Sequence, residues 1–165
     1  RRPDGSRPGT AQLRDRGLTV GTVESATGGL IADMLTSVPG SSHFYKGSVV
    51  AYSNETKTAV VGVHPETIER HGAVSSEVAE EMAAGGRRLL GVDICLSDTG
   101  IAGPGGGSAH KPVGLFYIGF SFDGGTYSHR WLFEGNRTMN KRAAADAALR
   151  WLQDFLSAKW IPGLP

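Results

Sequence analysis

Clusters of glycine set between short apolar runs are the feature that most limits the folds open to this chain. Of its 165 residues 24 are glycine, and many of them gather at residues 28–29, 85–86, 103–107 and 124–125. Between these clusters, runs rich in β-branched residues alternate with segments whose apolar residues recur at helical spacing. Strands interleaved with helices predict an α/β fold, here a single-domain three-layer α/β/α sandwich with a mixed sheet.

The order of strand and helix signals gives this prediction its detail. Asp123 and Gly124 are a strong two-residue hairpin signal, so the last two strands should be antiparallel and the sheet mixed. Pro65 fits a helix start and Gly72 its end, while Ser75 fits the N-cap of a longer helix. The expected strands cover residues 18–23, 48–52, 92–96, 113–122 and 126–133, and the expected helices begin near residues 30, 65, 76 and 138.

Chain length and local composition predict one domain with loose ends. Residues 1–10 mix Arg, Pro, Gly, Asp and Ser without a periodic apolar pattern, so we expect them to be disordered or loosely ordered. Only residues 11–16 are suited to a helix before the first strand. The domain is expected to span residues 11–158, and residues 159–165 are expected to form a frayed tail.

Composition argues against several classes of function. A formal net charge of +1 gives no field that would hold a polyanion, so nucleic acid is not an expected partner. No apolar run approaches the roughly 18 residues of a membrane span, so no membrane association is expected. Cys95 stands alone inside an apolar run, which predicts a buried thiol and the cytoplasm. The histidines are scattered and no cysteine pair exists, so no metal site is predicted.

The first candidate site is the segment from Glu24 to Gly29, where a strand turns into a helix. It combines a carboxylate, the hydroxyls of Ser25 and Thr27 and the permissive backbone of Gly28. Unpaired N–H groups at a helix start can hold a phosphate or an oxyanion, which suits a serine nucleophile. The residue types alone favour a simpler role, in which Ser25 or Thr27 caps the helix.

The second candidate site follows the second expected strand and comprises Tyr52, Ser53, Asn54 and Lys57. Because the carboxyl ends of parallel strands share one edge of a sheet, Lys57 can meet Ser25 there. A lysine acts as a general base only where burial or a nearby positive charge lowers its pKa toward neutrality. Taken alone, Lys57 is of the residue type that is mostly solvated at the surface.

Two further segments can bind an anion. Residues 99–107 contain five glycines, and such a loop lets backbone N–H groups approach a ligand closely. The loop matches neither a nucleoside-triphosphate phosphate loop nor a Rossmann fingerprint, and a flexible inter-strand loop is the alternative. Arg137 and Arg142, near the start of the last helix, can pair with a phosphate or belong to a solvated basic face.

Six motifs in order along the chain resemble the CinA C-terminal domain family, whose members with established activity are nicotinamide-nucleotide amidases. The resemblance spans residues 18–156. It implies hydrolysis of nicotinamide mononucleotide to nicotinate mononucleotide and ammonia in pyridine nucleotide salvage, with no metal and no cofactor. The nucleotide-pyrophosphatase-like domain of longer members is expected to be absent. The motifs are Glu24-Ser25-Ala26-Thr27-Gly28-Gly29, Val38-Pro39-Gly40-Ser41-Ser42, Val50-Ala51-Tyr52-Ser53-Asn54-Glu55-Thr56-Lys57, His71-Gly72-Ala73-Val74-Ser75, Thr99-Gly100-Ile101-Ala102-Gly103-Pro104-Gly105-Gly106 and Lys111-Pro112-Val113-Gly114.

The resemblance also implies roles for individual residues. Ser25 and Lys57 would form a Ser-Lys pair that works through an acyl-enzyme, with Tyr52 close by as a second proton carrier. The oxyanion is expected at N–H groups near Thr27 and Gly28 or in residues 100–107, and Glu24 is expected to orient the serine or the ribose. The expected substrate-binding residues are Glu24, Thr27, Gly28, Gly29, Ser41, Ser42, Asn54, Thr99, Gly100, Ala102, Gly103, Arg137 and Arg142.

Two alternatives to this function stay open. One is a non-catalytic nucleotide-binding or regulatory module that has the same loops, and the presence of both Ser25 and Lys57 argues against it. The other is a hydrolase of another small amide that uses the same pair of residues. The expected partner is a small-molecule nucleotide substrate, and a homodimer is left open.

Overall fold

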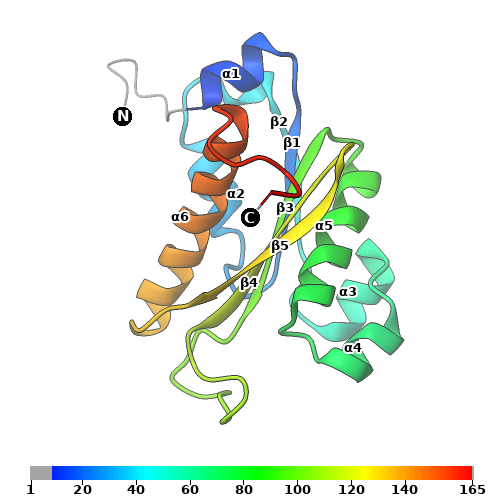
Figure 1. Cartoon of the computed structure of the whole chain (residues 1–165), viewed down its shortest axis with the longest axis vertical. Helices are drawn as coiled ribbons and strands as arrows, with labels where there is room; N and C mark the ends of the chain where they lie inside the picture. Colours follow the sequence, from blue (N-terminus) through cyan, green and yellow to red (C-terminus); the bar gives the residue numbers. More distant parts are fainter. Residues whose placement is uncertain (1–8, 165) are drawn as a thin grey trace.

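Five strands form one mixed sheet within residues 9–164, the part of the chain that the computed structural model describes (Figure 1). The strands are β1 (Val20–Glu24), β2 (Tyr45–Val50), β3 (Ile94–Gly100), β4 (Leu115–Phe122) and β5 (Gly125–Leu132). Their order across the sheet is β2-β1-β3-β4-β5. β1 is parallel to β2 and β3, whereas β4 is antiparallel to β3 and β5. The predicted mixed sheet is therefore confirmed.

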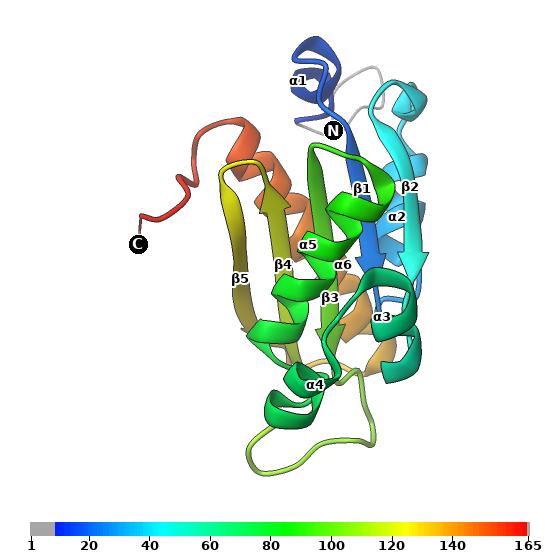
Figure 2. The ribbon, with the colours of Figure 1, turned by 90° about the vertical axis from the view of Figure 1, so that its right-hand side faces the viewer.

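Helices cover both faces of this sheet (Figure 2). They are α1 (Thr10–Asp15), α2 (Leu30–Thr36), α3 (Asn54–Val61), α4 (Pro65–His71), α5 (Ser76–Leu90) and α6 (Arg137–Leu156), with a short 3-10 helix η1 (Ser41–His43) before β2. α2 and α6 lie on one face, and α5 lies along the other with α3 and α4 beside it. This arrangement is the predicted three-layer sandwich.

Each face of the sheet carries its own hydrophobic cluster. The cluster between the sheet and α6 includes Phe116, Phe120 and Trp151. The cluster between the sheet and α5 includes Met82 and Cys95. Burial raises the pKa of the Cys95 thiol to about 12, so this side chain behaves as the predicted buried apolar group.

Two glycines explain how closely α5 packs on its neighbours. A Cβ atom on Gly85 would lie 1.9 Å from the carbonyl oxygen of Val61 in α3, and one on Gly86 would lie 2.2 Å from a methyl group of Val23 in β1. Only a residue without a side chain fits at these two points. α5 is therefore seated against β1 and α3 together, which fixes α3 beside the end of β1.

Part of each terminal segment that the sequence predicts to be loose is ordered in the described residues. α1 begins at Thr10, within the segment expected to be loose, while residues 1–8 of that segment lie outside the described residues. The tail was expected to fray, but the ring of Trp160 packs at centroid distances of 5.6 Å from Phe120 and 5.2 Å from Trp151. An indole buries a large apolar area, so Trp160 anchors a tail in which Ile161 and Leu164 are exposed.

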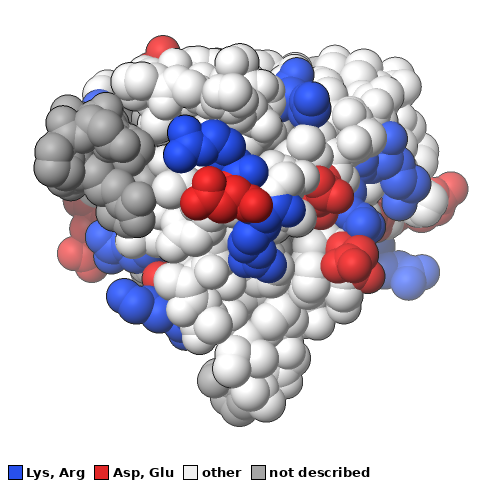
Figure 3. Space-filling model, turned by 90° about the horizontal axis from the view of Figure 1, so that it is seen from above, with Lys and Arg blue, Asp and Glu red and all other residues white. Residues whose placement is uncertain are grey.

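Charged side chains of both signs alternate on the end of the molecule that carries α1, which Figure 3 shows from above. No continuous patch of one sign covers this face, in keeping with the net charge of +1. Among the helices of residues 9–164, none is long and apolar enough to cross a bilayer.

Candidate functional site

Ser25 follows the last residue of β1 and begins a tight turn into α2, and we call residues 25–29 the Ser25 turn. Gly28 and Gly29 have backbone φ angles of 63° and 104°, in the left-handed region that glycine adopts without strain. The turn places Ser25 at the carboxyl edge of the parallel strands, where open α/β sheets bind ligands. Its side chain is only 7% exposed.

Lys57 reaches Ser25 from α3, the helix that follows the neighbouring strand β2. The Ser53 hydroxyl caps α3 by accepting a hydrogen bond from the Thr56 N–H at 3.1 Å, and Lys57 follows in the first turns of the helix. The lysine is 2% exposed, and its Nζ donates to Ser25 Oγ at 3.0 Å and to the carbonyl oxygen of Tyr52 at 2.7 Å. The structure thus joins the serine and the lysine that the sequence placed on separate segments.

The surroundings of Lys57 favour its neutral form. Burial lowers the pKa of its ammonium group, because a charge is poorly solvated inside the protein, whereas the negative charge of Asp98 acts in the opposite direction. A lysine whose pKa is lowered can accept a proton from a hydroxyl that it contacts. The arrangement is therefore that of a nucleophile beside its base.

Asp98 belongs to the site although the sequence analysis did not name it. The third strand extends beyond its predicted end at residue 96, so Asp98 lies in β3 and is 0% exposed. Its carboxylate accepts hydrogen bonds from the backbone N–H groups of Ser25 at 3.0 Å and of Thr27 at 3.1 Å. Burial is the largest cause that raises the pKa of this carboxyl group, to about 6. A lone aspartate between an apolar strand and a glycine-rich loop was the signal that could have found it.

Glu24 caps α2, although the sequence led us to expect that it orients the serine or the ribose. It is 0% exposed, and its carboxylate accepts from the N–H groups of Gly29, Ile31 and Ala32 at 2.8–3.1 Å. The prediction of a ligand contact is wrong because the side chain turns back toward the helix start, where N–H groups lack partners. Thr27 is also buried, and its hydroxyl contacts this carboxylate, not the cavity.

A cavity of about 260 Å³ opens directly over the serine and the lysine. It receives Asn54 from α3, Thr99 and Gly100 from the end of β3, and Arg137 from the start of α6. Its remaining lining residues are mostly glycine and alanine, whose small side chains let a ligand approach backbone N–H and carbonyl groups. The lining residues are Ser25, Ala26, Tyr52, Asn54, Lys57, Ala73, Val74, Thr99, Gly100, Ile101, Ala102, Gly103, Gly105, Gly106 and Arg137.

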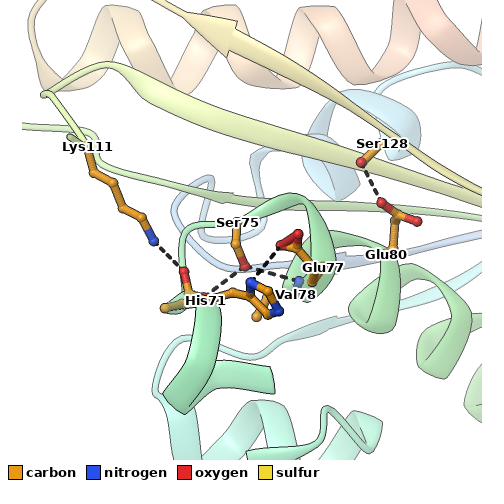
Figure 4. Close-up of polar contacts among 8 residues, drawn as sticks. His71, Ser75, Glu77, Val78, Glu80, Lys111 and Ser128 are labelled. Atoms are coloured by element: carbon orange, nitrogen blue, oxygen red, sulfur yellow. Dashed lines mark hydrogen bonds and ion pairs between the residues drawn. The ribbon is translucent and has the colours of Figure 1, made fainter. Parts of the chain in front are cut away.

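Residues 101–114, which we call the glycine-rich loop, are held at both sides of this cavity. On one side Arg137 donates to the carbonyl oxygen of Gly103 at 2.8 Å. On the other side Lys111 Nζ donates to the carbonyl oxygen of His71 at 2.5 Å, at the end of α4 (Figure 4). Thr99 adds a bond from its hydroxyl to the carbonyl oxygen of Ala73 at 2.8 Å. The loop is thus a defined wall of the site.

Side chains next to the Lys111 contact fix the turn between α4 and α5 (Figure 4). The Ser75 hydroxyl accepts from the Val78 N–H at 3.2 Å and donates to the carbonyl oxygen of Gly72 at 2.9 Å, so it caps α5 as predicted. His71 Nδ1 lies 3.7 Å from Glu77 Oε2. Ala73 and Val74, which line the cavity, are therefore presented by a capped turn.

Several predicted binding residues do not reach the cavity. Ser41 and Ser42 lie in η1 before β2, whereas Ser25 follows the end of its parallel neighbour β1, so about 20 Å of strand separates them. Arg142 is exposed and lies about 140° around α6 from Arg137, because each helical residue turns by about 100°. Gly28 and Gly29 shape the Ser25 turn but do not line the cavity.

Tyr52 lines the cavity in a different way from the one predicted. Its side chain is 63% exposed, and its contact with Lys57 is made by its backbone carbonyl oxygen. The backbone of Tyr52 thus positions the lysine, and a role of its hydroxyl as a proton carrier stays a prediction.

Two of the N–H groups expected to bind the oxyanion already have acceptors in the structure. The N–H of Thr27 donates to Asp98 and the N–H of Gly28 donates to the carbonyl oxygen of Ser25, so neither is free. Within residues 9–164, the N–H of Ala26 has no acceptor, and this residue lines the cavity next to Ser25. Because Ala26 is adjacent to Ser25, its N–H is a candidate donor to an oxyanion formed at the serine.

Comparisons with known proteins agree with this fold. A CinA-like protein of Chloroherpeton thalassium is 46% identical over 150 residues, which are 88% of this chain and 36% of that protein. A CinA-like protein of Desulfosudis oleivorans is 53% identical over 136 residues, or 82% of this chain and 33% of that protein. The chain thus spans about a third of the length of these curated relatives.

Solved structures match over nearly their whole length. A competence-damaged protein (CinA) superfamily protein from Klebsiella pneumoniae superposes with a TM-score of 0.88 at 34% identity, covering 93% of this chain and 95% of that one. The competence/damage inducible protein CihA from Agrobacterium tumefaciens gives a TM-score of 0.86 at 39% identity, covering 89% and 90%. The family model of the CinA C-terminal domain matches residues 8–156. The chain is therefore a member of the CinA C-terminal domain family.

Proposed function

We propose that this chain is an amidohydrolase that converts nicotinamide mononucleotide to nicotinate mononucleotide and ammonia through an acyl-enzyme on Ser25. The observation that carries the proposal is the hydrogen bond of 3.0 Å between Lys57 Nζ and Ser25 Oγ, made by a lysine that is 2% exposed. The substrate comes from the family resemblance, and the cytoplasm remains the expected compartment because the lone cysteine is of a kind found in reducing surroundings.

In the first step, neutral Lys57 takes the proton of the Ser25 hydroxyl while Oγ attacks the carboxamide carbon. The carbonyl π bond breaks, and its electron pair becomes the oxyanion of a tetrahedral intermediate. The N–H of Ala26 supports that oxyanion, and removal of one such donor typically costs ~3 kcal/mol of transition-state stabilisation. The Tyr52 carbonyl keeps Lys57 Nζ in place during the transfer.

In the second step, the Lys57 ammonium returns its proton to the leaving nitrogen, and the carbon–nitrogen bond breaks to release ammonia. Lys57 is then neutral again and removes a proton from the water that attacks the ester. Cleavage of the ester restores the Ser25 hydroxyl and releases the acid. One amide and one water thus give one acid and one ammonia, with Lys57 carrying every proton.

The phosphate of the substrate is proposed to lie at the edge of the cavity beside Arg137. This guanidinium is exposed, and it comes from the first residue of α6. Arginine presents several donors in one plane, a geometry that matches phosphate oxygens. The N–H groups of the glycine-rich loop would complete this part of the site.

The direct test is to incubate the purified chain with nicotinamide mononucleotide and follow ammonia. We expect release that Ser25→Ala abolishes and that Ser37→Ala, a change at an exposed serine, leaves unaltered. Release no greater than that of Ser25→Ala would reject the enzyme and favour a binding module. Equal rates on nicotinamide mononucleotide and free nicotinamide would reject the phosphate contact and indicate another small-amide hydrolase.

A further inference from the structure

The hydroxyl of Thr27 lies between two buried carboxyl groups. Its Oγ1 is 2.7 Å from Glu24 Oε1 and 2.5 Å from Asp98 Oδ1, and both acidic side chains are 0% exposed. A hydroxyl has one proton to donate. Two contacts this short from one hydroxyl to two carboxylates would leave one pair of oxygens without a proton between them. A second proton is therefore needed in this network.

Glu24 is the carboxyl group with the larger number of hydrogen-bond donors around it. Besides the N–H groups of Gly29, Ile31 and Ala32 at the start of α2, it accepts from Thr22 Oγ1 at 2.8 Å. The hydroxyls of Ser48 and Tyr45 continue this chain, and each can donate to the next oxygen toward Glu24. Glu24 thus accepts hydrogen bonds from three backbone N–H groups and from the Thr22 hydroxyl, in addition to its contact with Thr27.

Asp98 has fewer such donors. It accepts from two backbone N–H groups, those of Ser25 and Thr27. An oxygen of a protonated carboxyl group can still accept from an N–H while its own O–H points to Thr27 Oγ1. In that arrangement Thr27 donates its proton to Glu24, and every short contact has a proton.

We propose that Asp98 is a positioning residue that carries a proton and donates it to Thr27, which leaves Lys57 beside a neutral group and free to act as base. This inference rests on the proposed function for its effect on catalysis. Its structural part, a protonated Asp98, is independent of the substrate.

The charges around the pair support this assignment. Glu24 comes from β1, Lys57 comes from α3, and the register partner of Asp98 on β4 is the apolar Ile118. Burial is the main cause that raises the pKa of Asp98, and the charge of Glu24 raises it further, whereas the hydrogen bonds from Thr27 and Ser25 act in the opposite direction. An ionised Asp98 would instead stabilise the Lys57 ammonium, because its charge raises the pKa of the lysine. The proton on Asp98 thus keeps Lys57 available for Ser25.

The first experiment compares pH profiles of kcat/KM for deamidation of nicotinamide mononucleotide. Thr27→Val removes the acceptor of the Asp98 proton, so Asp98 ionises more readily and the acid limb should move up by about one pH unit. Asp98→Asn added to Thr27→Val should return the limb to its wild-type position. Thr36→Val, at an exposed site on α2, is the matched control.

Asp98→Asn alone separates the two charge states. A neutral amide resembles the protonated acid, so the acid limb should stay at its wild-type pH even if the rate falls. A limb that moves a full unit lower would mean that Asp98 is ionised in the working enzyme, which overturns the proposal. A Thr27→Val variant that loses rate without moving the limb would also overturn it, since that is the mark of a purely structural role.

The second experiment needs no turnover. Infrared spectra of the full chain just below pH 6, where a carboxyl group with a pKa of about 6 is protonated, should show the carbonyl stretch of a protonated carboxylic acid. This band should disappear in Asp98→Asn and remain in Glu134→Gln, where the side chain is exposed. Absence of the band, or its persistence in Asp98→Asn, would overturn the proposal even if ammonia is released. A band of the expected behaviour without ammonia release would instead reject the proposed function.

Discussion

The Ser25 turn and the glycine-rich loop face each other across the cavity, and they are held in opposite ways. The turn is fixed from beneath by two carboxyl groups that are 0% exposed, Glu24 and Asp98. The loop is fixed by long cationic side chains, Lys111 and Arg137, that bond to backbone carbonyl groups near the surface. Buried hydrogen bonds to a carboxyl group are harder to replace than contacts exposed to solvent. The Ser25 turn is thus held rigidly, whereas the glycine-rich loop is held by weaker contacts.

The largest expected effect is on the turn side, from Lys57→Met. Methionine fills a similar volume but cannot accept the Ser25 proton, so we expect kcat/KM for the nucleotide to fall by about 10³-fold or more. The fold should persist, because an apolar side chain suits a site that is 2% exposed. Lys46→Met, at an exposed lysine, is the control. A loss below tenfold in a folded variant would show that Lys57 is not the base.

The same variant tests the pKa of Lys57 through stability. Burial lowers this pKa below the value of 10.5 that the unfolded chain has. As the pH falls from 10.5 toward the folded pKa, the unfolded chain binds a proton that the folded chain does not, so the wild type loses stability. Lys57→Met should therefore gain stability relative to the wild type over this range in urea denaturation. A difference that stays constant with pH would contradict the lowered pKa.

Glu24→Gln should give the next largest effect, on folding. The amide places donor hydrogens against N–H groups at the start of α2, so we expect the free energy of unfolding to fall by about 3 kcal/mol. Urea denaturation measures this, with Glu55→Gln at an exposed position of α3 as the control. If Glu24→Gln were as stable as that control, the carboxylate would not be what holds the turn.

On the loop side, Arg137→Ala should act on substrate binding. Loss of the exposed guanidinium should raise KM about tenfold with a small change in kcat, equivalent to roughly 1.4 kcal/mol. Arg142→Ala, on the same helix but turned away from the cavity, is the matched control. An equal rise of KM in both variants would show that Arg137 acts only through its charge and makes no specific contact with the substrate.

The smallest expected effect comes from Lys111→Ala. Its bond to the His71 carbonyl is near the surface, where such contacts contribute about 0.2–1 kcal/mol, so KM should rise by no more than about fivefold. Amide hydrogen exchange in residues 101–114 should become faster, while exchange in the Ser25 turn stays unchanged. Lys159→Ala is the control, and unchanged exchange in the loop would show that Lys111 does not hold it.

Much of the fold was open to prediction because its signals are local. The hairpin at Asp123 and Gly124, the Ser75 cap and the alternation of strands with helices each depend on a few neighbouring residues. Parallel strand order then places the segments after β1 and β2 at one edge, which is enough to expect Ser25 near Lys57. Ser41 and Ser42 precede β2, so the same rule places them at the opposite edge. Their assignment to the site rested on a family motif, which does not show which of its residues line a cavity.

The sequence by itself determined the α/β class, the single buried cysteine and the segments that carry the nucleophile and its base. Only the tertiary structure decided what surrounds them. It turned Glu24 into a helix cap and Tyr52 into a backbone acceptor, and it brought Asp98 beneath Ser25 from a strand 73 residues away in the chain. The direction of a side chain and the state of a buried proton depend on neighbours remote in sequence, and no local pattern records them.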